Sequence, residues 1–77
     1  MIEVGQFYHN LQAIIEIIDK VNETNFLVSY KWEATFGSFS SDGPFETLHT
    51  DIIHMNYGRL STDEAKKLII KRTLKDG

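Results

Sequence analysis

The fold of this chain is decided by two runs, Ala13-Ile-Ile-Glu-Ile-Ile-Asp-Lys-Val21 and Phe26-Leu-Val-Ser-Tyr-Lys-Trp-Glu33. Apolar residues recur in them at period two, which is typical of half-buried strands. A turn over residues 22–25 folds the runs into an antiparallel hairpin with one largely apolar and aromatic face. Side-chain pairs directly across such a ladder each stabilise it by roughly 0.2–1 kcal/mol. The period-two pattern also predicts the register, because it determines which residues share the apolar face. The predicted pairs are Val21 with Phe26, Asp19 with Val28, Ile17 with Tyr30, Ile15 with Trp32 and, on the other face, Glu16 with Lys31.

The first run also fits a helix. Asn10 could cap its N-terminus, and helical spacing relates Leu11, Ile14, Ile15, Ile18 and Val21. Four isoleucines and the strong β-forming run that follows favour the strand. The predicted fold class is therefore mainly β, a small antiparallel barrel with one C-terminal α-helix. The alternative is an α+β fold with an N-terminal helix at about 10–22.

The rest of the chain gives weaker strand signals and one clear helix. Residues 4–8 predict a first strand, residues 40–43 a turn, and residues 47–55 a further strand that ends at 56–58. Pro44 is expected at the start or the edge of the returning strand. Ser61 and Glu64 form a capping box before a helix at about 62–74. We therefore expect one domain over 1–77, with the barrel at about 2–57 and the helix at about 61–75.

Length and composition limit the class of protein. A chain of 77 residues forms one domain with a small core. It has no cysteine and no run typical of a membrane span or a secretory signal, so the cytoplasm is the expected location. Residues 1–58 carry two basic and eight acidic side chains, a net of -6, whereas residues 59–77 carry six basic and three acidic ones, a net of +3. The acidic body repels phosphate, which leaves the tail for any nucleic-acid contact.

The sequence predicts no catalytic or metal-binding set. His49 and His54 are five residues apart, which places them on opposite faces of a strand and roughly 140° apart around a helix. His49 and Asp51 alone are too few ligands for a closed zinc site. The serines within 38–41 lie in a turn-rich stretch without the base and orienting group that an activated nucleophile needs. We therefore expect a protein that is not an enzyme, with no metal and no cofactor.

Aromatic residues give the sharper functional hypothesis. An aromatic shelf can bind a peptide, a base or a partner's side chain, because aromatic groups bring a large contact area at low entropic cost. For Trp32 a place in the core is favoured over a contact role, since so small a domain must bury its largest apolar groups. For Phe36 and Phe39 core and contact are equally supported, and an exposed pair would mark a binding surface. The candidate partner-binding residues are Tyr30, Trp32, Phe36, Phe39 and Phe45.

Lysines surround the polar side of the predicted C-terminal helix. The candidates for phosphate contact are Lys66, Lys67, Lys71 and Lys75. A solvated face whose charges complement the helix dipole explains the same residues. The solvated face is favoured, because neither an arginine-rich groove nor a single-strand stacking motif is present.

Three segments carry a resemblance to a known family: Val4-Gly5-Gln6-Phe7-Tyr8, the isoleucine-rich run ending Ile17-Ile18-Asp19, and the run from Phe26 to Trp32. Over about residues 2–55 they resemble small SH3-like barrel proteins, whose openings of this kind recur in phages and prophages. SH3-like domains include proline-motif readers, nucleic-acid modules and inhibitors of host enzymes. The resemblance therefore implies a SH3-like barrel and binding rather than catalysis.

The expected function is that of a non-enzymatic binding module that docks onto a larger protein. It would serve as a phage-encoded accessory protein or as an inhibitor of a bacterial host or defence enzyme. The alternative is a nucleic-acid-binding SH3-like module that uses the basic helix. A homo-oligomer is a linked expectation, because a second copy could bury an exposed Phe36 and Phe39 surface. No membrane contact is expected.

Overall fold

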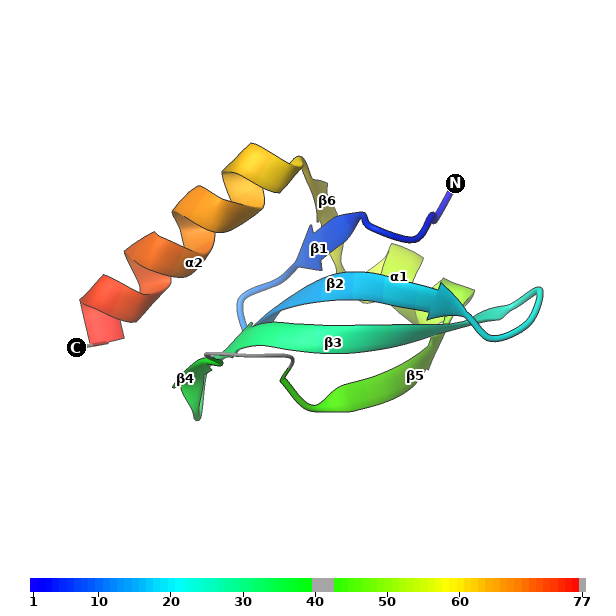
Figure 1. Cartoon of the computed structure of the whole chain (residues 1–77), viewed down its shortest axis with the longest axis horizontal. Coiled ribbons are helices and arrows are strands. Elements are labelled where there is room, and N and C mark those ends of the chain that lie inside the picture. Colours follow the sequence, from blue (N-terminus) through cyan, green and yellow to red (C-terminus); the bar gives the residue numbers. More distant parts are fainter. Residues whose placement is uncertain (40–42, 77) are drawn as a thin grey trace.

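A long antiparallel hairpin forms the centre of the fold (Figure 1). Its strands are β2 (Ala13–Lys20) and β3 (Asn25–Glu33), joined by a turn in which Val21 and Asn22 donate to the Asn25 carbonyl. The predicted strand is confirmed, and the alternative helix at 10–22 is wrong. Three of the four isoleucines of β2, Ile14, Ile15 and Ile17, are fully buried, and this packing outweighs their helical spacing.

The computed structural model describes residues 1–39 and 43–76, which form an antiparallel sheet and a C-terminal helix. The sheet order is β4-β3-β2-β1-β6, and β5 also pairs with β3. The predicted mainly β fold class is confirmed. The turn predicted at 40–43 falls largely outside the described residues. The remaining elements are β1 (Phe7–His9), β4 (Gly37–Ser38), β5 (Phe45–His49), α1 (Thr50–Asn56), β6 (Gly58–Leu60) and α2 (Thr62–Asp76).

The register of the hairpin differs from the predicted one because the ladder contains two irregularities. Ile15 lies opposite Tyr30 and Ile14 opposite Trp32, so Lys31 is an extra residue on β3. The observed pairs are Ala13 with Glu33, Ile14 with Trp32, Ile15 with Tyr30, Glu16 with Ser29, Ile17 with Val28, Asp19 with Leu27 and Lys20 with Phe26. Glu16 and Lys31 still form an ion pair of 3.2 Å, although they are not directly opposite. A constant register was therefore the wrong expectation, since a bulge inserts one unpaired residue.

Each bulge moves a side chain to the other face of the sheet. Neighbouring residues of a strand point to opposite faces, so Trp32 beside Ile14 lies on the face opposite to Tyr30 beside Ile15. In the same way the extra residue Ile18 turns Asp19 away from the apolar face, and Asp19 is exposed. The predictions that Tyr30 and Trp32 share a face and that Asp19 pairs with Val28 on the apolar face are therefore wrong.

The segment after β5 is a helix and a strand rather than the single strand predicted at 47–55. His49 accepts a hydrogen bond from the Asp51 amide through Nδ1 and caps α1, which ends the strand. The predicted break at 56–58 is followed by β6, whose Gly58 pairs with His9 of β1. The barrel-like part thus extends to Leu60, and the first strand begins at Phe7 rather than at residue 4.

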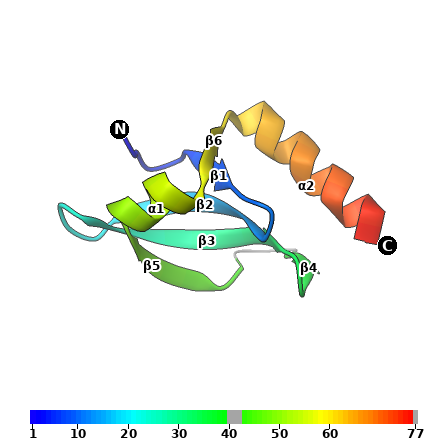
Figure 2. The same cartoon turned by 180° about the vertical axis from the view of Figure 1, so that it is seen from behind.

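Helix α1 covers the open side of the curved sheet (Figure 2). Among the described residues no pairing joins β5 to β6, and α1 connects these two strands. Ile53 of α1 is fully buried. The core cluster consists of Ile2, Tyr8, Ala13, Ile15, Ile17, Phe26, Val28, Leu48 and Ile53. The helix therefore links β5 to β6 and adds Ile53 to the core of the sheet.

Helix α2 begins at the predicted capping box. The Glu64 amide donates to Ser61 Oγ, and the Ser61 amide donates to Glu64 Oε1, each at 3.1 Å. Ala65 is buried and Leu68, Ile69 and Arg72 are partly buried, so these four residues form the stripe of α2 that packs on the sheet. The rest of the helix projects beside the sheet (Figure 1).

Candidate functional site

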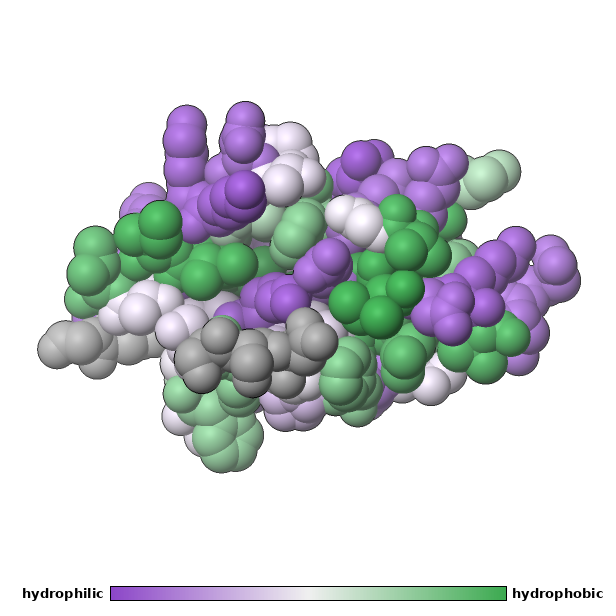
Figure 3. All heavy atoms as spheres, viewed as in Figure 1, coloured by the Kyte–Doolittle hydropathy of each residue, from purple (hydrophilic) through white to green (hydrophobic). Residues whose placement is uncertain are grey.

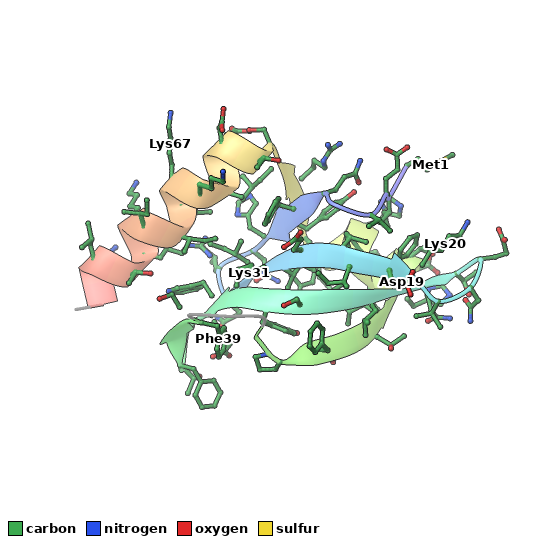
Figure 4. All side chains as sticks on the ribbon, in the orientation of Figure 1. Met1, Asp19, Lys20, Lys31, Phe39 and Lys67 are labelled. Carbon is green, nitrogen blue, oxygen red and sulfur yellow. The ribbon has the colours of Figure 1, made fainter. Side chains whose placement is uncertain are left out.

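An aromatic groove lies where β3, β4 and the start of β5 come together. Its volume is about 220 Å³, and its lining residues are Tyr30, Glu33, Phe36, Phe39 and Pro44. The Phe36 and Phe39 rings are tilted by 44° with 6.5 Å between their centroids. Figure 4 shows Phe39 beside β4 and the end of β3. We call this set of five residues the aromatic groove.

The apolar side chains at the groove are accessible. Phe36 is 74% exposed and Phe45, which directly follows Pro44, is 52% exposed. Tyr30 and Phe39 are partly buried and so form its floor. In Figure 3 hydrophobic side chains also project near the position of β4. Exposed aromatic groups around a concave surface are typical of a contact site.

Two carboxylates give the groove an acidic margin. Glu33 Oε1 accepts from the amides of Thr35 at 2.6 Å and Phe36 at 3.2 Å, which fixes the carboxylate beside the groove. The Tyr30 hydroxyl donates to Glu46 Oε1. Burial, followed by this hydrogen bond, raises the pKa of Tyr30 well above its ordinary value. The tyrosine is therefore a neutral donor at physiological pH, and both acids offer negative charge to a partner.

The chain reaches the groove through a close backbone approach at Gly43. A Cβ atom at this position would overlap the carbonyl oxygen of Tyr30 and would lie 2.9 Å from the Phe39 ring. The next residue, Pro44, accepts a hydrogen bond of 3.0 Å from the Tyr30 amide. Pro44 thus precedes β5 as predicted, and the absence of a side chain at Gly43 allows this strand to lie against β3.

Trp32 lies outside the aromatic groove. It is 5% exposed and pairs with Ile14, which is also buried. The guanidinium of Arg72 lies 4.8 Å from the centroid of its ring. The structure therefore brings Tyr30, Phe36 and Phe39 together at the groove. The predicted contact residue Phe45 pairs with Ser29 and is not one of the groove's lining residues, and the bulge at Lys31 places Trp32 under α2.

The lysines proposed for phosphate contact all lie exposed on α2: Lys66, Lys67, Lys71 and Lys75. Lys67 points away from the sheet (Figure 4). In Figure 3 hydrophilic side chains follow the upper margin of α2 and hydrophobic ones lie below them. The basic face is thus on a different element from the aromatic groove.

The histidines do not converge on a common point. His49 caps α1 and lies 3.7 Å from Asp51, His54 is exposed on α1, and His9 lies on β1. Among residues 1–39 and 43–76, no group of three His, Asp or Glu side chains is arranged to hold a metal ion. Within the same residues, no helix is long and apolar enough to cross a membrane.

Comparison with known proteins identified no relative. No protein-family model, no curated protein and no solved structure matches this chain. The site is therefore interpreted from its own residues.

Sequence reasoning missed part of the groove. It gave Pro44 a role only in the strand, and it assigned no role to Glu33, Gly43 or Glu46. The turn formers on either side of Phe36 and Phe39 were the available signal, because a Gly/Pro-rich stretch with exposed rings indicates a binding loop. The acidic margin carried no such signal, since it depends on pairing between β3 and β5.

Proposed function

We propose that this chain is a non-enzymatic binding module whose aromatic groove docks onto a larger protein. The observation that carries the proposal is the exposed Phe36 ring beside the half-buried Phe39. Such rings cost free energy in water unless a partner covers them, and aromatic side chains dominate the energetics of protein interfaces.

The chemistry of the margin supports a protein partner with a basic surface. Glu33 lines the groove, Glu46 accepts a hydrogen bond from the Tyr30 hydroxyl, and residues 1–58 carry a net charge of -6. Complementary charge speeds association and excludes acidic competitors. We further propose that the protein acts in the cytoplasm. Its small size and acidic body are in keeping with a phage-encoded accessory protein or an inhibitor of a host or defence enzyme.

Nucleic-acid binding is the second candidate, favoured by the exposed lysines of α2. Stacking of bases requires aromatic rings beside the basic groups. Here the lysines lie on α2 and the aromatic groove lies beside acids, so the separation favours a protein partner. A salt titration with short single and double strands tests the alternative: a steep loss of affinity, reduced by Lys67→Ala with Lys71→Ala, would support it.

Partner capture from cells of the source organism tests the preferred function. Phe36→Ala removes an exposed ring and should abolish retention of the partner while leaving the melting temperature unchanged. Leu11→Ala is the matched control, because Leu11 is 85% exposed and lies outside the groove. Retention that survives Phe36→Ala, or is lost equally with Leu11→Ala, would contradict the proposal.

A further inference from the structure

The outer edge of β5 carries backbone groups that point away from the sheet. Two bonds fix the phase of the β3–β5 ladder: the Tyr30 amide donates to Pro44 at 3.0 Å, and the Thr50 amide donates to Thr24 at 2.8 Å. Hydrogen-bonded pairs alternate along an antiparallel ladder. The backbone groups of residues 44, 46, 48 and 50 therefore face β3, and those of Phe45 and Thr47 face outward.

This edge is open in the part of the chain that the structure describes. There β5 pairs with β3 alone, and Phe45, Glu46 and Thr47 are all exposed. Natural edge strands are commonly protected by lysine, by proline within the strand or by a bulge. Between Phe45 and His49 there is no lysine and no proline, and the pairing with β3 is regular. The strand is thus a template for one more strand.

The open edge leads into the aromatic groove. Pro44 lines the groove and directly precedes β5, so an extended segment beside β5 would reach the groove at that end. Glu46 on the strand and Glu33 at the groove set the charge that such a segment meets. A second copy would bring its own Glu46 to this edge, and like charges across a ladder are destabilising.

We infer that the partner supplies an extended segment of alternating basic and apolar residues, which adds as a strand to the β5 edge and places an apolar side chain in the aromatic groove. This inference rests on the proposed function and specifies its ligand. The outward N–H and C=O groups of Phe45 and Thr47 provide the pairing, and the carboxylates select lysine or arginine.

The test uses NMR titration of the labelled protein with a short synthetic peptide of alternating lysine and valine. Saturable shifts are expected at the amides of Phe45 and Thr47 and at the ring of Phe36. Thr47→Pro removes an outward N–H without removing a hydrogen bond to β3. It should weaken peptide binding by about tenfold or more, because one hydrogen bond to the peptide is lost and the proline ring disturbs the pairing of the added strand. Thr47→Val keeps the backbone donor and should bind as the wild type does.

Peptide variants keep the test valid if Thr47→Pro unfolds the protein. A peptide N-methylated at alternate residues, and one with glutamate in place of lysine, should both fail to bind. Three results would overturn the inference: no saturable binding up to roughly 1 mM, the weak end of specific affinity; binding that N-methylation leaves intact; or a dimer of this chain that Thr47→Pro dissociates. Each leaves the proposed function standing if partner capture still depends on Phe36.

Discussion

Arg72 of α2 holds its guanidinium over the ring of Trp32, with 4.8 Å between the guanidinium carbon and the ring centroid. The same guanidinium donates a hydrogen bond of 2.8 Å to the carbonyl of Asn10. One side chain thus connects the helix both to the hairpin and to the turn before β2. Since the helix touches the sheet along a narrow stripe, this contact anchors its C-terminal half.

Arg72→Met should loosen that half of α2. It keeps an apolar stem but loses the cation–π contact and the hydrogen bond, a combined cost of about 1–2 kcal/mol in the free energy of unfolding. Urea denaturation measures the loss, and hydrogen exchange should show faster opening of the last turns of α2. Lys71→Met, at an exposed neighbouring position, should change stability by no more than about 0.5 kcal/mol. Equal losses in the two variants would remove the anchoring role.

Ile53→Ala should destabilise the protein by about 2–5 kcal/mol. Ile53 is fully buried on α1 and belongs to the core cluster of the sheet. The neighbouring Ile52 is 43% exposed, so Ile52→Ala should cost less than about 1 kcal/mol. Chemical denaturation of both variants checks the difference, and a small effect of Ile53→Ala would show that Ile53 does not anchor α1 to the core.

Gly43→Ala should disturb the aromatic groove. The added methyl group overlaps the Tyr30 carbonyl and crowds the Phe39 ring, so we expect a loss of about 1–3 kcal/mol together with changed chemical shifts for Phe39. At Gly58 an added Cβ would meet His9 Nε2 at 3.5 Å, an ordinary contact. Gly58→Ala is therefore the control and should be close to neutral. If Gly43→Ala is equally neutral, the close approach does not shape the groove.

His9 should make stability depend on pH. Burial, followed by the charge of Arg72, lowers the pKa of His9 below its ordinary value of 6.5, while Glu64 opposes the shift. The unfolded chain then binds a proton more readily than the folded one does. The contribution of neutral His9 to the free energy of unfolding is fully present above about pH 6.5. It is lost as the pH falls toward the pKa of His9 in the folded protein.

The melting temperature of the wild-type protein should fall as the pH drops below about 6.5, and His9→Gln should reduce this pH dependence. His54→Gln, at an exposed position on α1, is the control and should leave the pH dependence in place. A wild-type protein that becomes more stable as the pH falls through this range would contradict the assigned direction.

Local signals predicted the secondary structure where a few neighbouring residues decide it. The capping box of Ser61 and Glu64 has both predicted hydrogen bonds, because its donors and acceptors lie within one turn of chain. The hairpin strands were also predictable from their apolar pattern. In contrast, the region after His49 was assigned to the wrong element, because the helix-capping signal of His49 is weaker than a β-forming run in a single sequence.

Only part of the aromatic groove was predicted from the sequence. Tyr30, Phe36 and Phe39 come together, whereas Trp32 was placed on the wrong face. The reason is the bulge at Lys31, which changes the face of every residue beyond it. The position of a bulge depends on how the strands pack on both faces, so periodicity along the chain does not reveal it.

By itself, the sequence determined that residues 13–33 form a hairpin, that a capped helix follows Ser61, and that the aromatic residues gather near one loop. Only the tertiary structure decided the register, the burial of Trp32 beneath Arg72, the pairing of β6 with β1, and the acidic margin of the groove. The physical reason is the range of the interactions. Turns, caps and apolar alternation act between neighbours in the chain, whereas bulges and strand edges are set by contacts between segments far apart in it.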